Sequence, residues 1–137
     1  MRVRYKIPLA EYNECIRKAD IVIIPLKEKI AGGLLLLIQA GLMHKPVIAT
    51  DTPCTRNYIR DGKDGLLVSM GNPNELSIAI RTLAGSSVLR KKYADALHER
   101  ILECSPDNYV KSILEIIRHI KNTPNGGQYV YSNETNY

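Results

Sequence analysis

Two adjacent glycines and one glutamine inside an apolar segment are the residues whose chemistry stands out in this sequence. Gly32 and Gly33 lie in "KIAGGLLLLIQAG", where a helix over about 32–44 is predicted to begin, and Gln39 follows Gly32 by seven residues, two turns along one helix face. Unpaired N–H groups and the helix dipole favour an anion there, and glycine lets it approach, so phosphate is a candidate ligand. A tight strand-to-helix turn would also explain the glycines. Gln39 would bond either the hydroxyls of a ligand or a neighbouring loop.

Asp51 and Arg56 are two further candidates, because they follow a predicted strand over 45–51. Asp51 either faces the ligand or caps the turn that follows it, and Arg56 is a candidate phosphate or sugar contact. His44 is expected at the end of the glycine-started helix, where a cation complements the dipole. His98 is expected on a surface-facing helix. The sequence suggests no nucleophile–histidine pair and no metal-ligand cluster, and its three widely spaced cysteines indicate reduced thiols.

The elements that position these residues follow from hydrophobic periodicity and capping signals. Continuous β-branched runs such as "DIVIIPL" are typical of strands buried on both faces, and "GNPNEL" predicts a helix with Asn72 as N-cap and Pro73 at the first helical position. Strands are predicted at 3–7, 20–26, 45–51 and 66–70. Helices are predicted at 8–19, 32–44, 72–83, 86–104 and 105–121, with a short one inside 52–65. This alternation indicates an α/β domain with a mainly parallel, Rossmann-like sheet, which binds ligands at the carboxyl ends of its strands.

Length and composition limit the class of protein. A chain of 137 residues with 45% apolar and 24% charged residues suits one globular domain. No signal peptide is recognised, and the apolar stretch over 30–43 is too short to span a bilayer, so a cytoplasmic location is expected. The net charge of +5 suits a nucleoside-diphosphate ligand or an anionic membrane face. No nucleic acid is expected as a partner, because no basic-aromatic platform is present.

The order of these motifs resembles a known family. Five segments match the pattern of that family in the same order. They are Ala19-Asp20 to Pro25, Ala31 to Gln39, His44 to Asp51, Asp61 to Val68 and Gly71 to Leu83. The family's pattern begins with an "AD" strand that ends in Pro. It continues with a helix that starts with Glu-x(7)-Glu, with the segments "GKPVIATD" and "DGxxGLLV", and with a helix that has a Pro in its cap. The sequence is similar, over about residues 2–103, to the nucleotide-sugar-binding half of retaining glycosyltransferases of the GT-B fold. That family includes glycogen synthases and bacterial mannosyltransferases.

The resemblance implies a set of donor contacts. The backbone N–H groups of Gly32, Gly33 and Leu34 would bind the donor diphosphate, and Gln39, at the position of the second Glu, would bond the ribose. Ala31 stands where the family's first Glu contacts the transferred sugar, so that contact is absent. Lys6 and Ile7 are the candidates for contacting the nucleobase through their backbone. The family uses no metal and no cofactor, so none is expected here.

The resemblance also implies what the chain lacks. The family's acceptor domain and the first strands of its donor domain have no counterpart, so residues 1–121 are expected to form the C-terminal part of a GT-B fold and residues 122–137 a flexible tail. The whole enzyme would transfer sugar from a nucleoside-diphosphate sugar to a polysaccharide or lipid-linked acceptor, with peripheral membrane association as one arrangement. This chain alone is expected to be inactive, its partner being the acceptor domain or another subunit. The alternative is a non-catalytic assembly module that uses an exposed sheet edge, for example as a homodimer.

Overall fold

The computed structural model describes residues 7–27, 33–104 and 106–122. The chain divides into two compact units, residues 1–103 and residues 104–137. The single domain predicted for residues 1–121 stays a prediction, and the division between the two units lies within it, between residues 103 and 104. The boundary predicted for the tail lies one residue inside the last helix, and residues 123–137 lie outside the described part.

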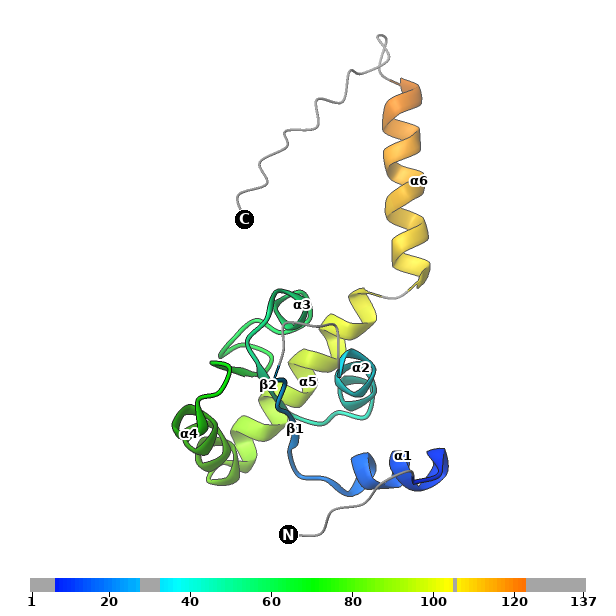
Figure 1. Ribbon diagram of the computed structural model, residues 1–137. Coiled ribbons are helices and arrows are strands. Elements are labelled where there is room, and N and C mark those ends of the chain that lie inside the picture. Colours follow the sequence, from blue (N-terminus) through cyan, green and yellow to red (C-terminus); the bar gives the residue numbers. More distant parts are fainter. Residues whose placement is uncertain (1–6, 28–32, 105, 123–137) are drawn as a thin grey trace. The chain divides into compact units, whose positions relative to one another are not determined.

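A three-stranded parallel sheet forms the centre of the first unit (Figure 1). Its strands are β1 (Val22–Ile24), β2 (Val47–Thr50) and β3 (Leu66–Val68), in the spatial order β1-β2-β3. All four residues of β2 are buried, as its position between two neighbours demands. The predicted α/β class with a parallel sheet is therefore confirmed. The strand predicted at 3–7 lies mostly outside the described residues, and Ile7 itself is not in a strand.

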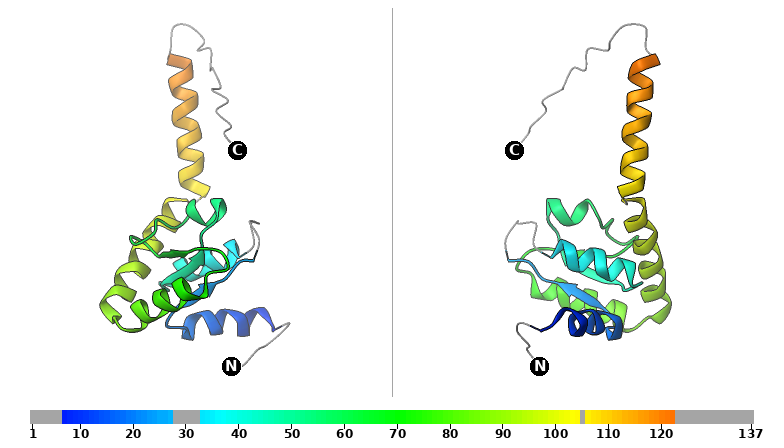
Figure 2. Two further views of the ribbon diagram at one scale, coloured as in Figure 1. Left: turned by 60° about the vertical axis from the view of Figure 1, so that its left-hand side comes forward. Right: turned by 90° about the vertical axis from the view of Figure 1, so that its right-hand side faces the viewer.

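Helices cover both faces of this sheet (Figure 2). The helices are α1 (Leu9–Lys18), α2 (Leu34–Leu42), α3 (Pro53–Arg56), α4 (Pro73–Ala84) and α5 (Ser87–Glu103). Side chains alternate between the faces of a strand, so Val47 and Ile48 of β2 belong to different cores. Val47 packs with residues of α2 and α5, and Ile48 with residues of α4 and α5. α5 thus spans both cores.

The contact between α2 and α5 depends on a small residue. A Cβ added to Gly41 would lie 2.7 Å from Ile101 Cγ1 and 3.2 Å from Leu97 Cγ, which is too close for a side chain. Leu97 is fully buried and Ile101 nearly so. Gly41 therefore lets α5 approach α2, and the two helices form one wall of the core around β1 and β2.

The last helix, α6 (Pro106–Asn122), belongs to the second unit. Five of its apolar side chains are at least 39% exposed, and they are Val110, Ile113, Leu114, Ile116 and Ile117. Most of these positions recur three or four residues apart, so they lie on one side of an amphipathic helix. Ser105, the first residue of the helix predicted at 105–121, lies outside the described residues.

Candidate functional site

The carboxyl ends of the three strands meet at one edge of the sheet. A pocket of about 290 Å³ lies there. It is lined by the segment after β1, by the end of β2, and by the turn from β3 into α4, including Leu26, Lys27, Thr50, Ser69 and Asn72. Ligands of open parallel sheets bind in this position, so the pocket fits the place that the sequence predicts for a site.

Thr50 fastens the ends of β1 and β2 together at this pocket. Its Oγ1 accepts a hydrogen bond from the Leu26 N–H at 2.8 Å and lies 3.4 Å from the Leu26 carbonyl oxygen, to which it donates. Thr50 is only 4% exposed, so these bonds satisfy a buried hydroxyl and hold the chain after β1 against β2. No local pattern predicts this contact, because its partners are 24 residues apart in the chain.

Gly33 is the residue before α2, and its backbone is left-handed, with φ of 77°. A Cβ at this position would lie 2.5 Å from Ile24 Cγ2, so both the turn and its packing on β1 require glycine. The helix begins at Leu34, and the Leu37 N–H donates to the Gly33 carbonyl at 3.0 Å. The amides of the first turn therefore have no intrahelical acceptor. Gly32 and Ala31 lie outside the described residues.

Gln39 lies in the second turn of α2, within an otherwise apolar helix sequence. Its Oε1 is shielded from solvent and has no hydrogen-bond partner in the described part of the chain, and the same holds for Asn13 Oδ1 in α1. The loop-backbone alternative considered for Gln39 is thus not realised among the described residues. A buried carbonyl oxygen without a partner destabilises a fold, so this atom is suited to accept a bond from something outside the chain.

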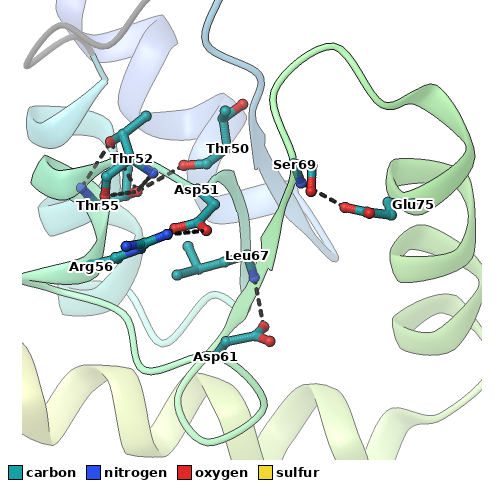
Figure 3. Close-up of polar contacts among 9 residues, drawn as sticks. All are labelled: Thr50, Asp51, Thr52, Thr55, Arg56, Asp61, Leu67, Ser69 and Glu75. Atoms are coloured by element: carbon teal, nitrogen blue, oxygen red, sulfur yellow. Dashed lines mark hydrogen bonds and ion pairs between the residues drawn. The ribbon is translucent and has the colours of Figure 1, made fainter.

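Asp51 and Arg56 form an ion pair with two parallel bonds (Figure 3). Arg56 Nε lies 2.6 Å from Asp51 Oδ1, and the second guanidinium nitrogen lies 2.7 Å from Oδ2. The hydrogen bond from Arg56 lowers the pKa of the Asp51 carboxyl below its ordinary value. Both predicted residues are thus brought together, with Arg56 already bound to a carboxylate.

The cap of α3 is Thr52, and the expectation that Asp51 caps this turn is wrong. Thr52 Oγ1 accepts from the Thr55 N–H at 3.1 Å, and the Thr52 N–H donates to Thr55 Oγ1 at 2.9 Å (Figure 3). This reciprocal arrangement is a capping box, and both residues are 1% exposed. The signal was present in the sequence as Thr52-Pro53-x-Thr55, a hydroxyl residue three positions before another.

Two carboxylates close the outer side of β3. Asp61 Oδ1 accepts from the Leu67 N–H at 2.8 Å, and Glu75 Oε2 accepts from the Ser69 N–H at 2.6 Å (Figure 3). The bond from the Ser69 amide lowers the pKa of Glu75. A second pocket of about 360 Å³ is lined by these carboxylates together with Asp51 and Arg56. Asp51, Asp61 and Glu75 each already accept a hydrogen bond. We therefore interpret this pocket as part of the folded structure and not as a ligand site.

The histidines lie elsewhere. His44 follows α2 with φ of 51°, its Nδ1 lies 3.1 Å from Asp95 Oδ1, and its ring stacks on His98 at 3.8 Å between centroids. His98 is half-buried, so its expected surface-facing position is only partly right, and its Nδ1 lies 3.1 Å from the Gly41 carbonyl oxygen. Lys91, and next His44, lower the pKa of Asp95. No group of three or more metal-ligating side chains occurs within the described residues.

The sequence matches a family of known proteins. A family model described as "Glycosyl transferases group 1" matches residues 2–86. The chain belongs to this family. The matched residues include all three strands and the helices α1 to α4, so the predicted family is confirmed.

The relatives that the chain matches include two longer glycosyltransferases. The chain is 33% identical over 86 residues to the phosphatidyl-myo-inositol mannosyltransferase of Mycobacterium leprae, covering 63% of this chain and 23% of that protein. It is 26% identical over 120 residues to the D-inositol 3-phosphate glycosyltransferase of Corynebacterium urealyticum, covering 88% of this chain and 28% of that protein. The chain thus spans less than a third of each of these two relatives.

Solved structures agree on the fold. The Anabaena protein Alr3699/HepE in complex with UDP superimposes with a TM-score of 0.66 at 19% identity, over 77% of this chain and 29% of that one. The C-terminal domain of a group 1 glycosyltransferase, LpcC of Francisella tularensis, gives 0.65 at 23% identity, over 73% and 50%. The fold is therefore that of a GT-B C-terminal-type domain.

The remaining residues predicted to contact the donor lie partly inside and partly outside the described residues. Lys6 lies outside the described residues, and Ile7 is half-buried just before α1. Leu34 is the first residue of α2 and is half-buried. Within the described ranges no helix has the length and apolar character needed to cross a membrane.

Proposed function

We propose that this chain binds the nucleoside-diphosphate part of a sugar nucleotide at the carboxyl ends of β1 and β2, as the donor-binding part of a glycosyltransferase. The diphosphate would lie at the start of α2, against the backbone N–H groups of Gly33 and Leu34. The ribose would lie further along the helix, at Gln39. The whole enzyme would transfer the sugar to a polysaccharide or lipid-linked acceptor, and the name of the phosphatidyl-myo-inositol mannosyltransferase among the relatives supports a lipid-linked one.

The start of α2 supports the diphosphate part of this proposal. The N-cap residues of α3 and α4 are Thr52 and Asn72, whose side chains accept first-turn N–H groups. The N-cap residue of α2 is Gly33, which has no side chain to do so, and no acidic residue lies in the first turn of this helix. The positive end of the α2 dipole can therefore interact with a ligand. A diphosphate group carries the negative charge that this helix end favours.

The partnerless Oε1 of Gln39 is the single observation that carries the proposal. A ribose diol has two O–H donors, and one of them would satisfy this oxygen. A residue retained for packing alone would be apolar, as its helix neighbours are. Gln39 thus behaves as a group whose hydrogen-bond partner arrives with the ligand.

Calorimetric titration of the purified chain with UDP, GDP and ADP tests this assignment. We expect one of them to bind, and Gln39→Met to weaken it roughly tenfold, the size of one lost hydrogen bond. The same variant should be no less stable than wild type, because methionine fills a similar volume without a buried polar atom. Asn74→Ala, at an exposed amide of α4, is the matched control.

Two outcomes would contradict the proposal separately. A folded chain that binds none of the three nucleotides would overturn donor binding by this chain. Binding that Gln39→Met leaves unchanged would overturn the ribose assignment alone. We also propose that the isolated chain transfers no sugar, since it has no acceptor domain among its described elements; release of nucleoside diphosphate coupled to a glycosylated acceptor would refute that.

A further inference from the structure

A second pocket with charged walls lies at the amino ends of β1 and β2, the edge of the sheet opposite the candidate donor pocket. Its volume is about 500 Å³, and its walls are the residues before β1, the residues before β2 and the first half of α5. Small-molecule sites are commonly about 300–1,000 Å³ in volume. None of the lining residues belongs to the proposed donor site, so a ligand held here would be a separate one.

The carboxylate of Asp95 in this pocket is already neutralised. Lys91 Nζ lies 2.7 Å from Asp95 Oδ2, and His44 Nδ1 lies 3.1 Å from Asp95 Oδ1. Lys91, and next His44, lower the pKa of Asp95, so the carboxylate is held in its charged form with both oxygens bonded. Asp95 therefore does not pair with the other cations of the pocket.

Two cations in the pocket keep donors that no described residue uses. Lys45 is half-buried, and its ammonium group forms no ion pair or hydrogen bond within the described part of the chain. Arg90 is also half-buried, and one terminal nitrogen donates to the Leu83 and Ala84 carbonyls at 2.7 and 2.9 Å. These bonds fix the guanidinium, while its Nε and other terminal nitrogen have no described partner. Ammonium and guanidinium donors of this kind bind phosphate through charge-assisted hydrogen bonds.

Asp20 gives the pocket a requirement of the opposite kind. Its side chain is exposed, lines the pocket, and pairs with no described cation. An ionised carboxylate repels a phosphate but accepts hydrogen bonds from hydroxyl groups. A ligand that suits both ends of the pocket therefore carries a phosphate and at least one hydroxyl.

We propose that this pocket binds a phosphorylated polyol, with its phosphate on Lys45 and Arg90 and a hydroxyl group on Asp20. The site is distinct from the proposed nucleotide site and lies at the other end of the strands. The inference does not depend on the proposed function, because it rests on residues that the donor site does not use.

Titration of the ¹⁵N-labelled chain by nuclear magnetic resonance tests the site, with glycerol 3-phosphate and inorganic phosphate as probes at equal ionic strength. We expect both probes to shift the amide resonances of Lys45 and Ala94. Glycerol 3-phosphate should bind roughly tenfold more tightly, the size of one added hydrogen bond. Lys45→Gln should weaken both probes roughly tenfold, because it removes one charge-assisted bond to phosphate.

Asp20→Ala separates the two parts of the proposal. It should tighten the binding of inorganic phosphate, because a repelling carboxylate is removed, and it should abolish the preference for glycerol 3-phosphate. Asp20 is exposed, so this variant should fold, and it tests the site even if Lys45→Gln does not. Lys92→Gln, an exposed lysine of α5 outside the pocket lining, is the matched control and should change nothing.

Three results would overturn the proposal. Probes that shift Gly33 and Leu34 in place of Lys45 and Ala94, and that Gln39→Met weakens, would be bound at the proposed nucleotide site. Equal loss of affinity in Lys45→Gln and Lys92→Gln would mean general attraction to a basic surface. A preference for glycerol 3-phosphate that is missing in the wild type, or that survives in Asp20→Ala, would exclude the polyol contact.

Discussion

Gly33→Ala should destabilise this protein by two separable effects. The residue has φ of 77°, in the left-handed region, and an added Cβ would lie 2.5 Å from Ile24 Cγ2 and 3.6 Å from Leu26 Cδ2. Ile24 is a strand residue that is 4% exposed, so it has little freedom to move aside. The substitution therefore combines backbone strain with a steric overlap inside the core.

The two contributions have known sizes. A left-handed conformation costs a residue other than glycine roughly 1–2 kcal/mol. Forcing an extra methyl group into a packed core costs about 1–3 kcal/mol more. The sum is about 2–5 kcal/mol, a large share of the stability of a small domain. Gly62→Ala separates the effects, because Gly62 has φ of 70° but its added Cβ would meet nothing within 4 Å. It should lose only the roughly 1–2 kcal/mol of backbone strain.

Urea unfolding followed by far-ultraviolet circular dichroism measures both variants. We expect Gly33→Ala to lose at least 1 kcal/mol more than Gly62→Ala, about the lower limit of the steric contribution. A double-mutant cycle with Ile24→Ala removes the methyl group that is struck, so in that background the Gly33→Ala effect should shrink to the backbone contribution. Equal losses for the two glycine variants, or no coupling to Ile24, would refute the steric argument.

Three further predictions concern stability. Asn72→Ala removes the side chain that accepts the Glu75 N–H at 3.1 Å, so it should lose about 1 kcal/mol in urea unfolding, and no loss would contradict its role as cap. Leu97→Ala opens a cavity at a fully buried position shared by α2 and α5 and should lose about 2–5 kcal/mol, with an intact far-ultraviolet spectrum at low denaturant. The pKa values of Asp51 and Glu75 are lowered in the folded state, so their stabilisation is complete above their ordinary pKa of about 4 and is lost as pH falls below it. Asp51→Asn with Glu75→Gln should therefore flatten the acid side of the stability profile, and an unchanged profile would show that other groups dominate.

The sequence predicted the sheet and most helices because their signals are local. The run Val47–Thr50 reads as a buried strand and is buried at each residue. Asn72 and Pro73 were predicted as N-cap and first helical residue, and both hold these positions. Patterns of this kind depend on neighbours in the chain, so no tertiary contact is needed to interpret them.

The site was less predictable because its contacts join distant segments. The steric reason for Gly33 lies in Ile24, nine residues earlier, and the partner of Thr50 is Leu26. The sequence left two roles open for Asp51 because an aspartate and a threonine both make good caps, and only the fold shows that Thr52 caps α3. Carboxylates that close a strand edge carry no local pattern either, so the roles of Asp61 and Glu75 were missed.

Thr50 and Gln39 show how this fold treats buried polar atoms. The hydroxyl of Thr50 bonds both backbone groups of Leu26, and it needs nothing from outside the chain. Gln39 Oε1 is also shielded from solvent, and no described residue bonds it, a state that destabilises a folded protein by about 1–3 kcal/mol. A ligand that donates a hydrogen bond to this oxygen would recover part of that free energy. The nucleotide that binds should therefore raise the melting temperature of wild type more than that of Gln39→Met at equal saturation. An equal rise in the two proteins would mean that the ligand does not reach Gln39, and that this amide is an uncompensated defect of the helix.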